Sequence, residues 1–385
     1  MYRRYRRART LPRTFVTALT AAALGATLTS SALAATATSG PCSRSVDPYT
    51  LSIAELNACG AESYPLSSVT MRSDGAHEYN FKVGRLTVSY IEPPASFQPA
   101  RASTAELSRY PGLTPPPEGS TQRPLWQQMI DEVQFGPPPA RQVIVPRSSL
   151  SDVPVPSTTL TPLTSEAGAE KSLNWSGYDN YASTQKYNTA AAYYVEPEPK
   201  ATCSGAQWVA WAGLGGKNSG NLEQNGTANY VPYVGSHEAW WEVLPYGIAP
   251  VEGTYATAGA YFEAQTHWVN SEKVSFYFYN YSTKKAKEVN VSGVPGSDRS
   301  TADYIVERPA YEEGGHWYLP PLTSYSPITM QGFSNGTALE NNPYNSQQMF
   351  EITNTLLASA SGIGEGSSYQ FTDTYHNCGG VYKLK

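Results

Sequence analysis

The sequence predicts an all-β fold, an antiparallel β-sandwich, for its C-terminal half, residues 171–385. One observation is alternation, because Val274, Phe276 and Phe278 are separated by single Ser and Tyr residues. Successive residues of a strand point to opposite faces of a sheet, so a period of two is typical of strands. The other observation is spacing. Short runs of this kind recur about every 8–12 residues between Gly, Asn, Pro and Ser, without a helical period, which is typical of a sandwich or barrel.

Residues 1–34 have the three parts of a secretory signal peptide. A basic start is followed by an apolar, Ala-rich run from Phe15 to Leu28, and Ser31-Ala32-Leu33-Ala34 supplies small residues for cleavage after Ala34. The apolar run is shorter than the roughly 20 residues that a membrane span needs. We therefore expect a secreted, extracellular protein with no membrane segment after signal removal, and an uncleaved signal anchor is the alternative. The basic residues are Arg3, Arg4, Arg6, Arg7, Arg9 and Arg13.

Residues 35–170 are expected to form a pro-region with a Pro-rich linker. Proline is frequent between residues 93 and 164. Because proline removes a backbone donor and restricts φ, this stretch should not be regular sheet or helix throughout. The small, polar residues at 157–170 are typical of an exposed linker that a protease can cut. The sequence therefore predicts a zymogen that associates with its own pro-region, and an accessory domain that stays attached is the alternative.

Two further features of the pro-region lead to expectations. Leu125, Met129 and Val133 repeat every four residues, which predicts one helix at Leu125–Phe135. Arginines are scattered through the same region, whereas the C-terminal half is acidic. We expect these arginines to dock on the acidic cleft and to release it when carboxylates are protonated. They are Arg101, Arg109, Arg123, Arg141 and Arg147.

The charge balance argues against a nucleic-acid partner. Charged residues make up 15% of the chain, and from Lys171 onward 12 Lys and Arg stand against 19 Asp and Glu. Few cations are then available to neutralise phosphates. The same balance suits acid, because little positive charge remains to repel itself once the carboxylates are protonated. An ordinary, mildly acidic secreted protein would have a similar composition.

The four cysteines are expected to form disulfides, because the chain is exported. Their positions suggest that Cys42 pairs with Cys59 and Cys203 with Cys378, although four cysteines allow three pairings. The sequence contains no C-x-x-C, H-E-x-x-H or His-rich spacing. We therefore expect neither a metal nor another cofactor.

Three segments of the C-terminal half combine acidic or amide side chains with aromatic residues. They are Gln207–Thr227, His237–Pro245 and Thr301–Pro309. On a strand, Glu238, Trp240 and Glu242 would share one face, as would Asp303 and Glu307. The histidines of this half lie outside the sequence contexts of a Ser–His–Asp triad. The carboxylates and carboxamides are therefore the candidates for catalysis.

Five motifs resemble, in order and spacing, those of the glutamic peptidases, or eqolisins, a family of secreted acid endopeptidases. They are Asn174-Trp175-Ser176-Gly177-Tyr178, Trp211–Gly216, Leu222-Glu223-Gln224-Asn225-Gly226, Ala239-Trp240-Trp241-Glu242 with Pro245, and Ala302-Asp303-Tyr304-Ile305-Val306-Glu307. The resemblance covers roughly residues 172–340 and is to a bacterial-type secreted member. It implies a concanavalin-A-like jelly roll that cleaves polypeptide substrates, and we expect a monomer. Two positions depart from the pattern, since Gly215 replaces an aspartate of many fungal members and Asp303 replaces a glutamate.

The resemblance implies that Gln224 and Glu307 are the catalytic pair. Ionised Glu307 would act as general base on a water and then return the proton as general acid. The Gln224 amide would hold that water and stabilise the oxyanion. The residues expected to line the substrate cleft are Trp175, Trp211, Glu238, Trp240 and Glu242.

Two other functions fit the same residues. A secreted glycoside hydrolase on a similar jelly roll would use Glu242 and Glu307 as its carboxylate pair. A non-catalytic, carbohydrate-binding, lectin-like module or a degenerate homologue would keep the sandwich and its aromatic side chains without turnover.

Overall fold

The computed structural model describes residues 47–145, 169–182, 186–200, 203–217, 220–229, 237–296, 299–313, 315–364 and 369–384. These residues all belong to one compact unit that spans Ser39–Lys385. The expected signal peptide, Cys42, Arg147 and most of the expected linker lie outside the described residues. No helix in the described part of the chain is long and apolar enough to cross a membrane.

Antiparallel sheet dominates the C-terminal half, as the alternation of its sequence predicts. One layer, which we call the front layer, has the strand order β23–β7–β17–β10–β11–β12–β13. Side chains along each of its strands alternate between the core and the opposite face. The strands are β7 (Trp175–Tyr181), β10 (Trp208–Gly215), β11 (Leu222–Asn229), β12 (Glu238–Val243), β13 (Ile248–Tyr255), β17 (Thr301–Glu307) and β23 (Tyr344–Phe350).

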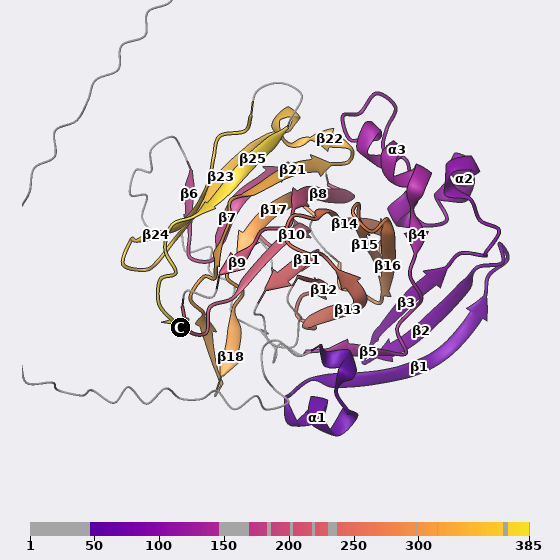
Figure 1. Cartoon of the computed structure of the whole chain (residues 1–385), viewed down its shortest axis with the longest axis horizontal. Coiled ribbons are helices and arrows are strands. Elements are labelled where there is room, and N and C mark those ends of the chain that lie inside the picture. The colour runs from indigo at the N-terminus through magenta and orange to yellow at the C-terminus, as the bar shows by residue number, and fades with distance from the viewer. Residues whose placement is uncertain are drawn as a thin grey trace, which may run out of the picture. The chain divides into compact units, whose positions relative to one another are not determined.

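A second layer, the back layer, has the strand order β16–β15–β14–β8–β21–β25. Strand β24 (Leu356–Ala360) pairs with β25 and with β23, so it joins the two layers at one side (Figure 1). Two packed antiparallel layers confirm the predicted β-sandwich. The strands of the back layer are β8 (Thr189–Val195), β14 (Tyr261–Asn270), β15 (Lys273–Asn280), β16 (Lys285–Ser292), β21 (Ile328–Ser334) and β25 (Gln370–Tyr375).

The core lies between the layers and takes every second residue of a strand. On β10, Trp208, Ala210 and Leu214 belong to the large buried cluster between the layers. Val209 and Trp211 belong to a separate buried cluster on the other face of the front layer. The odd-numbered residues of β10 therefore face away from the core, and they share this face with the candidate site.

Residues 47–145, which we call the N-terminal region, contain sheet and helices. The predicted helix is confirmed as α3, which buries Trp126, Met129 and Ile130. The proline-rich stretch also holds a short helix and two short strands. The elements of the region are α1 (Ile53–Ala58), β1 (Glu62–Met71), β2 (His77–Val83), β3 (Leu86–Glu92), α2 (Thr104–Leu107), α3 (Arg123–Glu132), β4 (Gln134–Phe135) and β5 (Arg141–Ile144).

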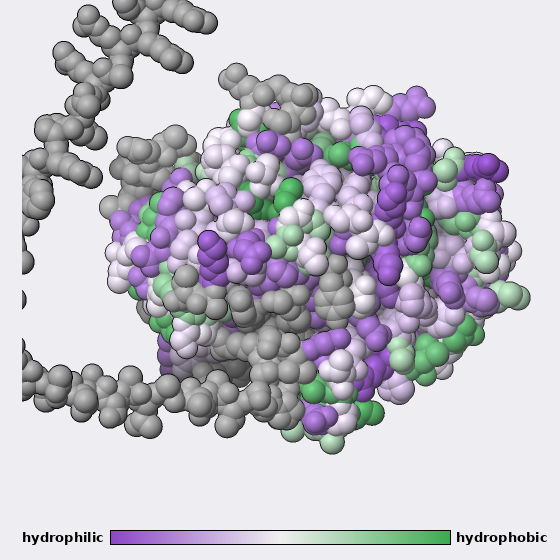
Figure 2. Space-filling model, in the orientation of Figure 1, coloured by the Kyte–Doolittle hydropathy of each residue, from purple (hydrophilic) through white to green (hydrophobic). Residues whose placement is uncertain are grey.

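Apolar side chains are dispersed over the visible surface. Leu66, Val69 and Met71 on β1 are exposed, the last by 75%. Figure 2 shows the hydrophobic residues of this view as small green patches between purple and white ones. In contrast to these exposed side chains, the aromatic residues on the outer face of the front layer, Trp175, Trp211 and Trp240, form a buried cluster. We call it the aromatic cluster.

A disulfide joins Cys203 to Cys378, as predicted. It links the segment before β10 to the C-terminal end of the chain. Cys59 is also disulfide-bonded, and its expected partner, Cys42, lies outside the described residues.

Candidate active site

The front layer carries all the predicted site residues on the face that points away from the core. Glu307 lies at the end of β17, opposite Val209 on β10 and opposite Trp175 on β7. Gln224 lies on β11, opposite Gly213 on β10. Residues opposite each other in an antiparallel pair share a face. Gln224 and Glu307 therefore flank β10 on one face, with an offset of four positions along it, about 13 Å on a flat strand.

The remaining predicted cleft residues share this face. Trp240 lies opposite Gly226, and Glu242 lies opposite Gln224. Glu238 lies on the same face, two residues before Trp240. The site thus takes its side chains from four neighbouring strands, β17, β10, β11 and β12, together with Trp175 on β7.

Glu307 is held by two N–H donors. The Asn174 side-chain amide donates to Oε1 at 3.0 Å, and the Trp211 indole N–H donates to Oε2 at 2.8 Å. Its side chain is almost completely buried. Donors to both oxygens fix the orientation of the carboxyl group. A carboxylate held in this way is placed to accept a proton from a water.

Gln224 is oriented by a carboxylate. Its Nε2 donates to Oε2 of Glu242 at 2.8 Å, and its side chain is buried. This bond turns the amide oxygen away from Glu242. Oε1 of Gln224 has no hydrogen-bond partner in the structure. Buried polar atoms are nearly always satisfied in folded proteins, so a free acceptor here marks a place for a water or for a substrate N–H.

The Trp211 indole lies between the two predicted catalytic residues. Its Nε1 reaches Glu307, while its Cζ3 lies 2.9 Å from the point where a Cβ on Gly213 would be. Cβ of Gln224 lies 3.1 Å from the same point. Glycine at position 213 therefore leaves the space that the indole occupies beside Gln224.

Aromatic rings make the apolar part of the site. Trp175 and Trp211 meet edge to face, with ring centroids 5.2 Å apart. Trp240, Val209 and Ile305 belong to the same buried cluster. The indole N–H groups of Trp175 and Trp240 are buried without a hydrogen-bond acceptor in the structure. Such donors can bind the carbonyl oxygens of an extended peptide.

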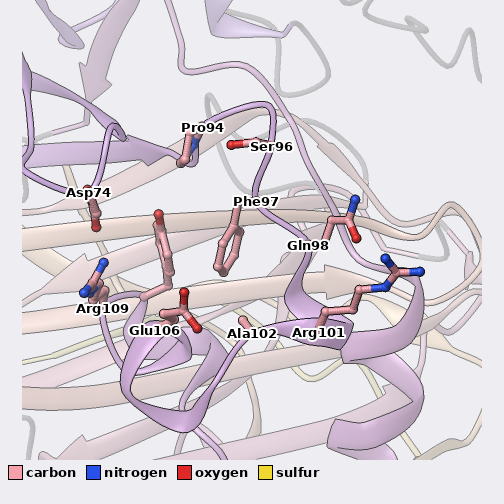
Figure 3. Close-up of a pocket in the computed structure, with 10 residues that line it drawn as sticks. Asp74, Pro94, Ser96, Phe97, Gln98, Arg101, Ala102, Glu106 and Arg109 are labelled. Carbon is pink, nitrogen blue, oxygen red and sulfur yellow. The ribbon is translucent and has the colours of Figure 1, made fainter.

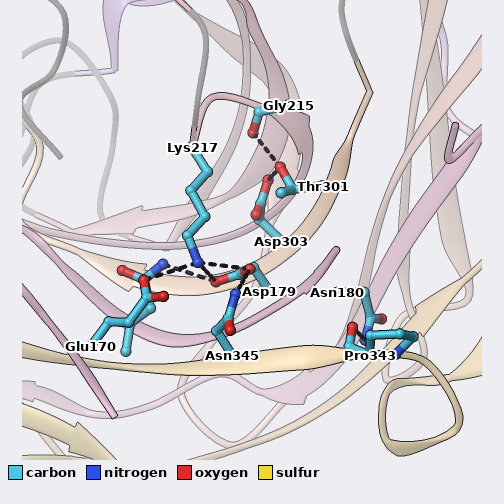
Figure 4. Close-up of polar contacts among 10 residues, drawn as sticks. Glu170, Asp179, Asn180, Gly215, Lys217, Thr301, Asp303, Pro343 and Asn345 are labelled. Carbon is cyan, nitrogen blue, oxygen red and sulfur yellow. Dashed lines mark hydrogen bonds and ion pairs between the residues drawn. The ribbon is translucent and has the colours of Figure 1, made fainter. Parts of the chain in front are cut away.

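A polar network next to the site includes residues that the sequence analysis did not single out. Asp179 lies opposite Asp303 in the pairing of β7 with β17, so it is level with Gly213. Lys217 donates to both oxygens of Asp179, at 2.8 and 3.0 Å, and pairs with Glu170 at 3.0 Å (Figure 4). Although Gly215 lacks the aspartate of many fungal members, this side of the site is still acidic.

Asn174 is the most important residue that the sequence analysis did not assign. From the sequence it was named only as the first residue of a family motif and given no role, but its side-chain amide donates a hydrogen bond to Glu307. The signal was present in the sequence, because Asn174 immediately precedes the strand that pairs with the end of β17. Without the register between β7 and β17, the sequence could not show that Glu307 is the residue that Asn174 contacts.

The glycosidase alternative takes its two carboxylates from strands that are not neighbours. Strands β10 and β11 lie between Glu242 on β12 and Glu307 on β17. Glu242 accepts a hydrogen bond from Gln224, and Glu307 accepts from Asn174 and Trp211. Each carboxylate is therefore held by its own donors.

The site is closed in the full-length chain. Gln224 and Glu307 are only 2% and 6% exposed. Val145, at the end of the N-terminal region, packs against the aromatic cluster and exchanges two backbone hydrogen bonds with Ile248 of β13. A peptide could not reach this face without a rearrangement.

The expectation that arginines dock on the cleft is wrong for those that the structure describes. Arg141 donates to three backbone carbonyls of residues 48–51. Arg123 donates to Pro116 and lies over the Trp126 ring. These partners belong to the N-terminal region itself, because backbone carbonyls near each arginine compete with the more distant carboxylates.

A pocket of about 480 Å³ lies elsewhere, within the N-terminal region (Figure 3). Its lining includes Asp74, Phe97, Arg101 and Glu106 and none of the predicted site residues. Within the described ranges, no group of three or more His, Cys, Asp or Glu side chains is arranged to hold a metal ion.

Comparison with known proteins agrees with the fold and with the motifs. Residues 173–370, just over half of the chain, match the Peptidase A4 family. The chain belongs to this family, and it is therefore a glutamic endopeptidase of the eqolisin type. The predicted resemblance is confirmed. A search of curated proteins gives no match.

Solved structures of glutamic peptidases are similar to about half of the chain. Scytalido-glutamic peptidase with a transition-state analogue inhibitor is 19% identical, with a TM-score of 0.46, over 53% of this chain and 98% of that chain. SCP-B, an eqolisin in complex with the tripeptide Ala-Ile-His, is 17% identical, with a TM-score of 0.43, over the same shares. Aspergilloglutamic peptidase from Aspergillus niger is 20% identical, with a TM-score of 0.35, over 44% of this chain and 99% of that chain.

Proposed function

We propose that the protein is a secreted, acid-acting endopeptidase that uses Glu307 and Gln224 to hydrolyse peptide bonds. The observation that carries this proposal is the state of the two side chains. Glu307 is held by two N–H donors on the same face as Gln224, whose buried amide oxygen has no partner. One group is prepared to take a proton and the other to hold a water.

In the proposed reaction, ionised Glu307 removes a proton from a water as that water attacks the peptide carbonyl. Oε1 of Gln224 accepts a hydrogen bond from the water, and its N–H₂ group stabilises the oxyanion once substrate displaces Glu242. Glu307 then returns the proton to the leaving amine. The indole N–H groups of Trp175 and Trp240 bind backbone carbonyls of the substrate.

Activity in acid follows from the use of one carboxylate. The glutamate side chain has a reference pKa of about 4.3, so a peptidase with a glutamate general base is suited to moderately acid solution. Gln224 has no charge that acid could change.

Secretion and synthesis as a zymogen are also proposed. Export rests on the predicted signal peptide at residues 1–34. The zymogen rests on the burial of Gln224 and Glu307 in the full-length chain and on the cleavable composition of residues 157–170. The catalytic chain of the secreted form should therefore begin near residue 170, and full activity in an uncut chain that begins at Ala35 would contradict this part of the proposal.

The test uses protein purified from culture medium, with denatured casein as substrate between pH 2 and pH 7. Cleavage should be strongest in acid and should resist pepstatin. Glu307→Gln and Gln224→Ala should each remove at least about 99% of the activity, as loss of a catalytic group does. Glu272→Gln is a matched control, because Glu272 is exposed in a turn far from the motif strands.

Folding of each variant is checked by circular dichroism. Full activity of Glu307→Gln would show that the catalytic residue is another one. Hydrolysis of a polysaccharide but not of casein would favour the glycosidase alternative.

A further inference from the structure

We propose that residues 47–145 remain bound to the peptidase domain after the chain is cut, and that they form one side of the working enzyme once the end of the region at Val145 has moved off the aromatic cluster. The proposal rests on the processing described under the proposed function, but it does not depend on which residues are catalytic. It concerns an interface between two parts of one chain, and it differs from a pro-region that dissociates.

The N-terminal region pairs with the edge strands of both layers. In the sandwich alone, β16 ends the back layer and β13 ends the front layer, and exposed edges of this kind invite pairing with other strands. Strand β3 pairs antiparallel with β16 along Thr87–Tyr90. Val145 pairs with Ile248 on β13, with N–O distances of 2.9 and 3.2 Å.

A continuous set of strands connects these two contacts. Strand β3 pairs with β2, β2 with β1, and β1 with β5, which leads directly to Val145. The sheet of the N-terminal region therefore spans from the back layer to the front layer and closes the side of the sandwich (Figure 1). Removal of the region would leave the outer edge of β16 unpaired and would break the bridge between Val145 and Ile248 on β13.

The region also completes the hydrophobic core. Phe81, Leu86 and Val88 are fully buried, and they belong to the same cluster as Trp241 and Phe276 of the peptidase domain. The Tyr90 hydroxyl donates to Gln142 at 2.8 Å inside this core. If the region dissociated, the side chains of the peptidase domain that pack against Phe81, Leu86 and Val88 would become exposed to solvent.

A second apolar contact lies on the outer face of the back layer. Gly112 packs so closely on Tyr277 that a Cβ at this position would lie 2.1 Å from the ring. The backbone N–H of Gly112 donates to Glu288 at 3.1 Å, and the Tyr277 hydroxyl lies 3.2 Å from the sulfur of Met129. Gly112 and Met129 of the N-terminal region are therefore buried against Tyr277 on β15.

One group of polar contacts at this interface, around Glu263, is kept in acid. Tyr193 donates to Glu263 at 2.8 Å and accepts from Gln122 of the N-terminal region at 2.9 Å. Tyr281, 3.5 Å from the other oxygen of Glu263, donates to the carbonyl of Leu125 at 3.2 Å. Burial raises the pKa of Glu263 to about 7, so in acid it is neutral and can donate to Tyr281. The titratable groups around it are Tyr193, Tyr261, Tyr277, Tyr279 and Tyr281, none of which ionises in acid.

The experiment uses the full chain with a recognition site for a sequence-specific protease inserted at residues 157–165 and with Glu307→Gln to prevent self-digestion. After the cut, the sample is passed through a size-exclusion column at pH 4 and at pH 7. Both fragments should elute together, at the volume of the uncut chain, and should separate only in denaturant. Elution of the N-terminal fragment on its own at either pH, including separation followed by precipitation, would overturn the proposal.

A pair of variants tests the interface itself. Gly112→Val should raise the apparent dissociation constant of the cut fragments at least about tenfold, because its side chain must enter the Tyr277 ring. Met71→Ala, on the exposed part of β1, should leave the constant unchanged. Equal constants for the two variants would contradict the proposed interface.

Co-elution of the two fragments is measured without any assay of peptidase activity, so the two proposals can fail separately. Fragments that stay together without casein cleavage by the wild-type protein would contradict the proposed function and not this inference. A catalytic fragment that is fully active and stable after the N-terminal fragment has left would contradict this inference and not the proposed function.

Discussion

The indole N–H of Trp211 donates a 2.8 Å hydrogen bond to Oε2 of Glu307, across the pairing of β10 with β17. The bond connects the aromatic motif of β10 to the carboxylate at the end of the neighbouring strand β17. It gives the tryptophan a polar function in addition to its place in the apolar wall. Trp211 is thus a positioning residue for the proposed general base.

Replacement of this donor should lower activity and change its pH dependence. Trp211→Phe keeps an aromatic ring but removes the N–H, and a hydrogen bond to a charged group contributes about 1.5–3 kcal/mol. We expect kcat to fall by about 10- to 100-fold. Activity on the acid side should also be lost at a higher pH, because the ionised carboxylate has one donor fewer.

Trp208→Phe is the matched control. Trp208 is buried on the same strand but faces the core, and its indole N–H has no acceptor in the structure. Its replacement should leave the pH profile in place. Identical profiles for wild type and Trp211→Phe would show that the indole bond does not act on the catalytic group.

Asn174→Asp should confine activity to more acid solution. The substitution replaces a donor with a second carboxylate about 3 Å from Glu307, and two carboxylates at this distance cannot both ionise easily. When one proton is shared in acid, a donor is restored. We expect near-complete loss of casein cleavage at pH 6 and partial recovery near pH 3. Asn270→Asp, at an exposed turn where the side-chain oxygen only accepts, should behave as wild type.

Gly213→Ala should damage the site without unfolding the protein. A Cβ at position 213 would lie 2.9 Å from the Trp211 ring, 3.0 Å from the backbone oxygen of Glu223 and 3.1 Å from Cβ of Gln224, so the indole and the adjacent part of β11 must shift. We expect kcat to fall by roughly tenfold or more, since small displacements of catalytic groups are costly, while the melting temperature changes little. Gly362→Ala, which meets no atom within 4 Å, should keep full activity. A normal kcat for Gly213→Ala would argue against the close placement of these groups.

Stability should increase as the solution becomes more acid. Burial raises the pKa of Glu263 to about 7 and that of Asp373 to about 6, from ordinary values of 4.5 and 3.8. Between these values the folded protein binds protons that the unfolded chain does not, so the free energy of unfolding falls as pH rises through this window. Each group contributes on the order of 1–3 kcal/mol.

The measurement is urea unfolding at pH 4 and pH 7.5. Glu263→Gln and Asp373→Asn should each reduce the difference between the two pH values, because an amide does not titrate. Glu272→Gln, an exposed control, should keep the difference of the wild type. If Glu263→Gln and Asp373→Asn both kept the wild-type difference in unfolding free energy between pH 4 and pH 7.5, these carboxyls would not be buried as described.

The sequence predicted which strands carry the chemistry but not how they meet. Alternation was enough to place Glu238, Trp240 and Glu242 on one face of β12. The register that sets Gln224 beside Glu242 could not be derived from it, because pairing depends on contacts between segments that are far apart in the chain. For the same reason Asn174 had no assigned role.

The N-terminal region is the part of the structure that the sequence predicted least well. Its residues were expected to belong to a removable pro-region, and only the helix α3 was predicted in it. In the structure β2 and β3 are paired antiparallel strands, and Phe81 and Val88 are buried in the shared core. The arginines were expected on the cleft because opposite charges attract, but nearby backbone carbonyls bind Arg141 and Arg123 instead.

By itself, the amino-acid sequence determined the β-sandwich, the family and the candidates for catalysis, since these follow from local alternation and from ordered motifs. Only the tertiary structure decided that Trp211 and Asn174 hold Glu307, that Glu242 orients Gln224, and that residues 47–145 close the side of the sandwich. The physical reason is that hydrogen bonds and buried contacts between distant segments depend on strand register and on the packing of layers, which no local pattern encodes.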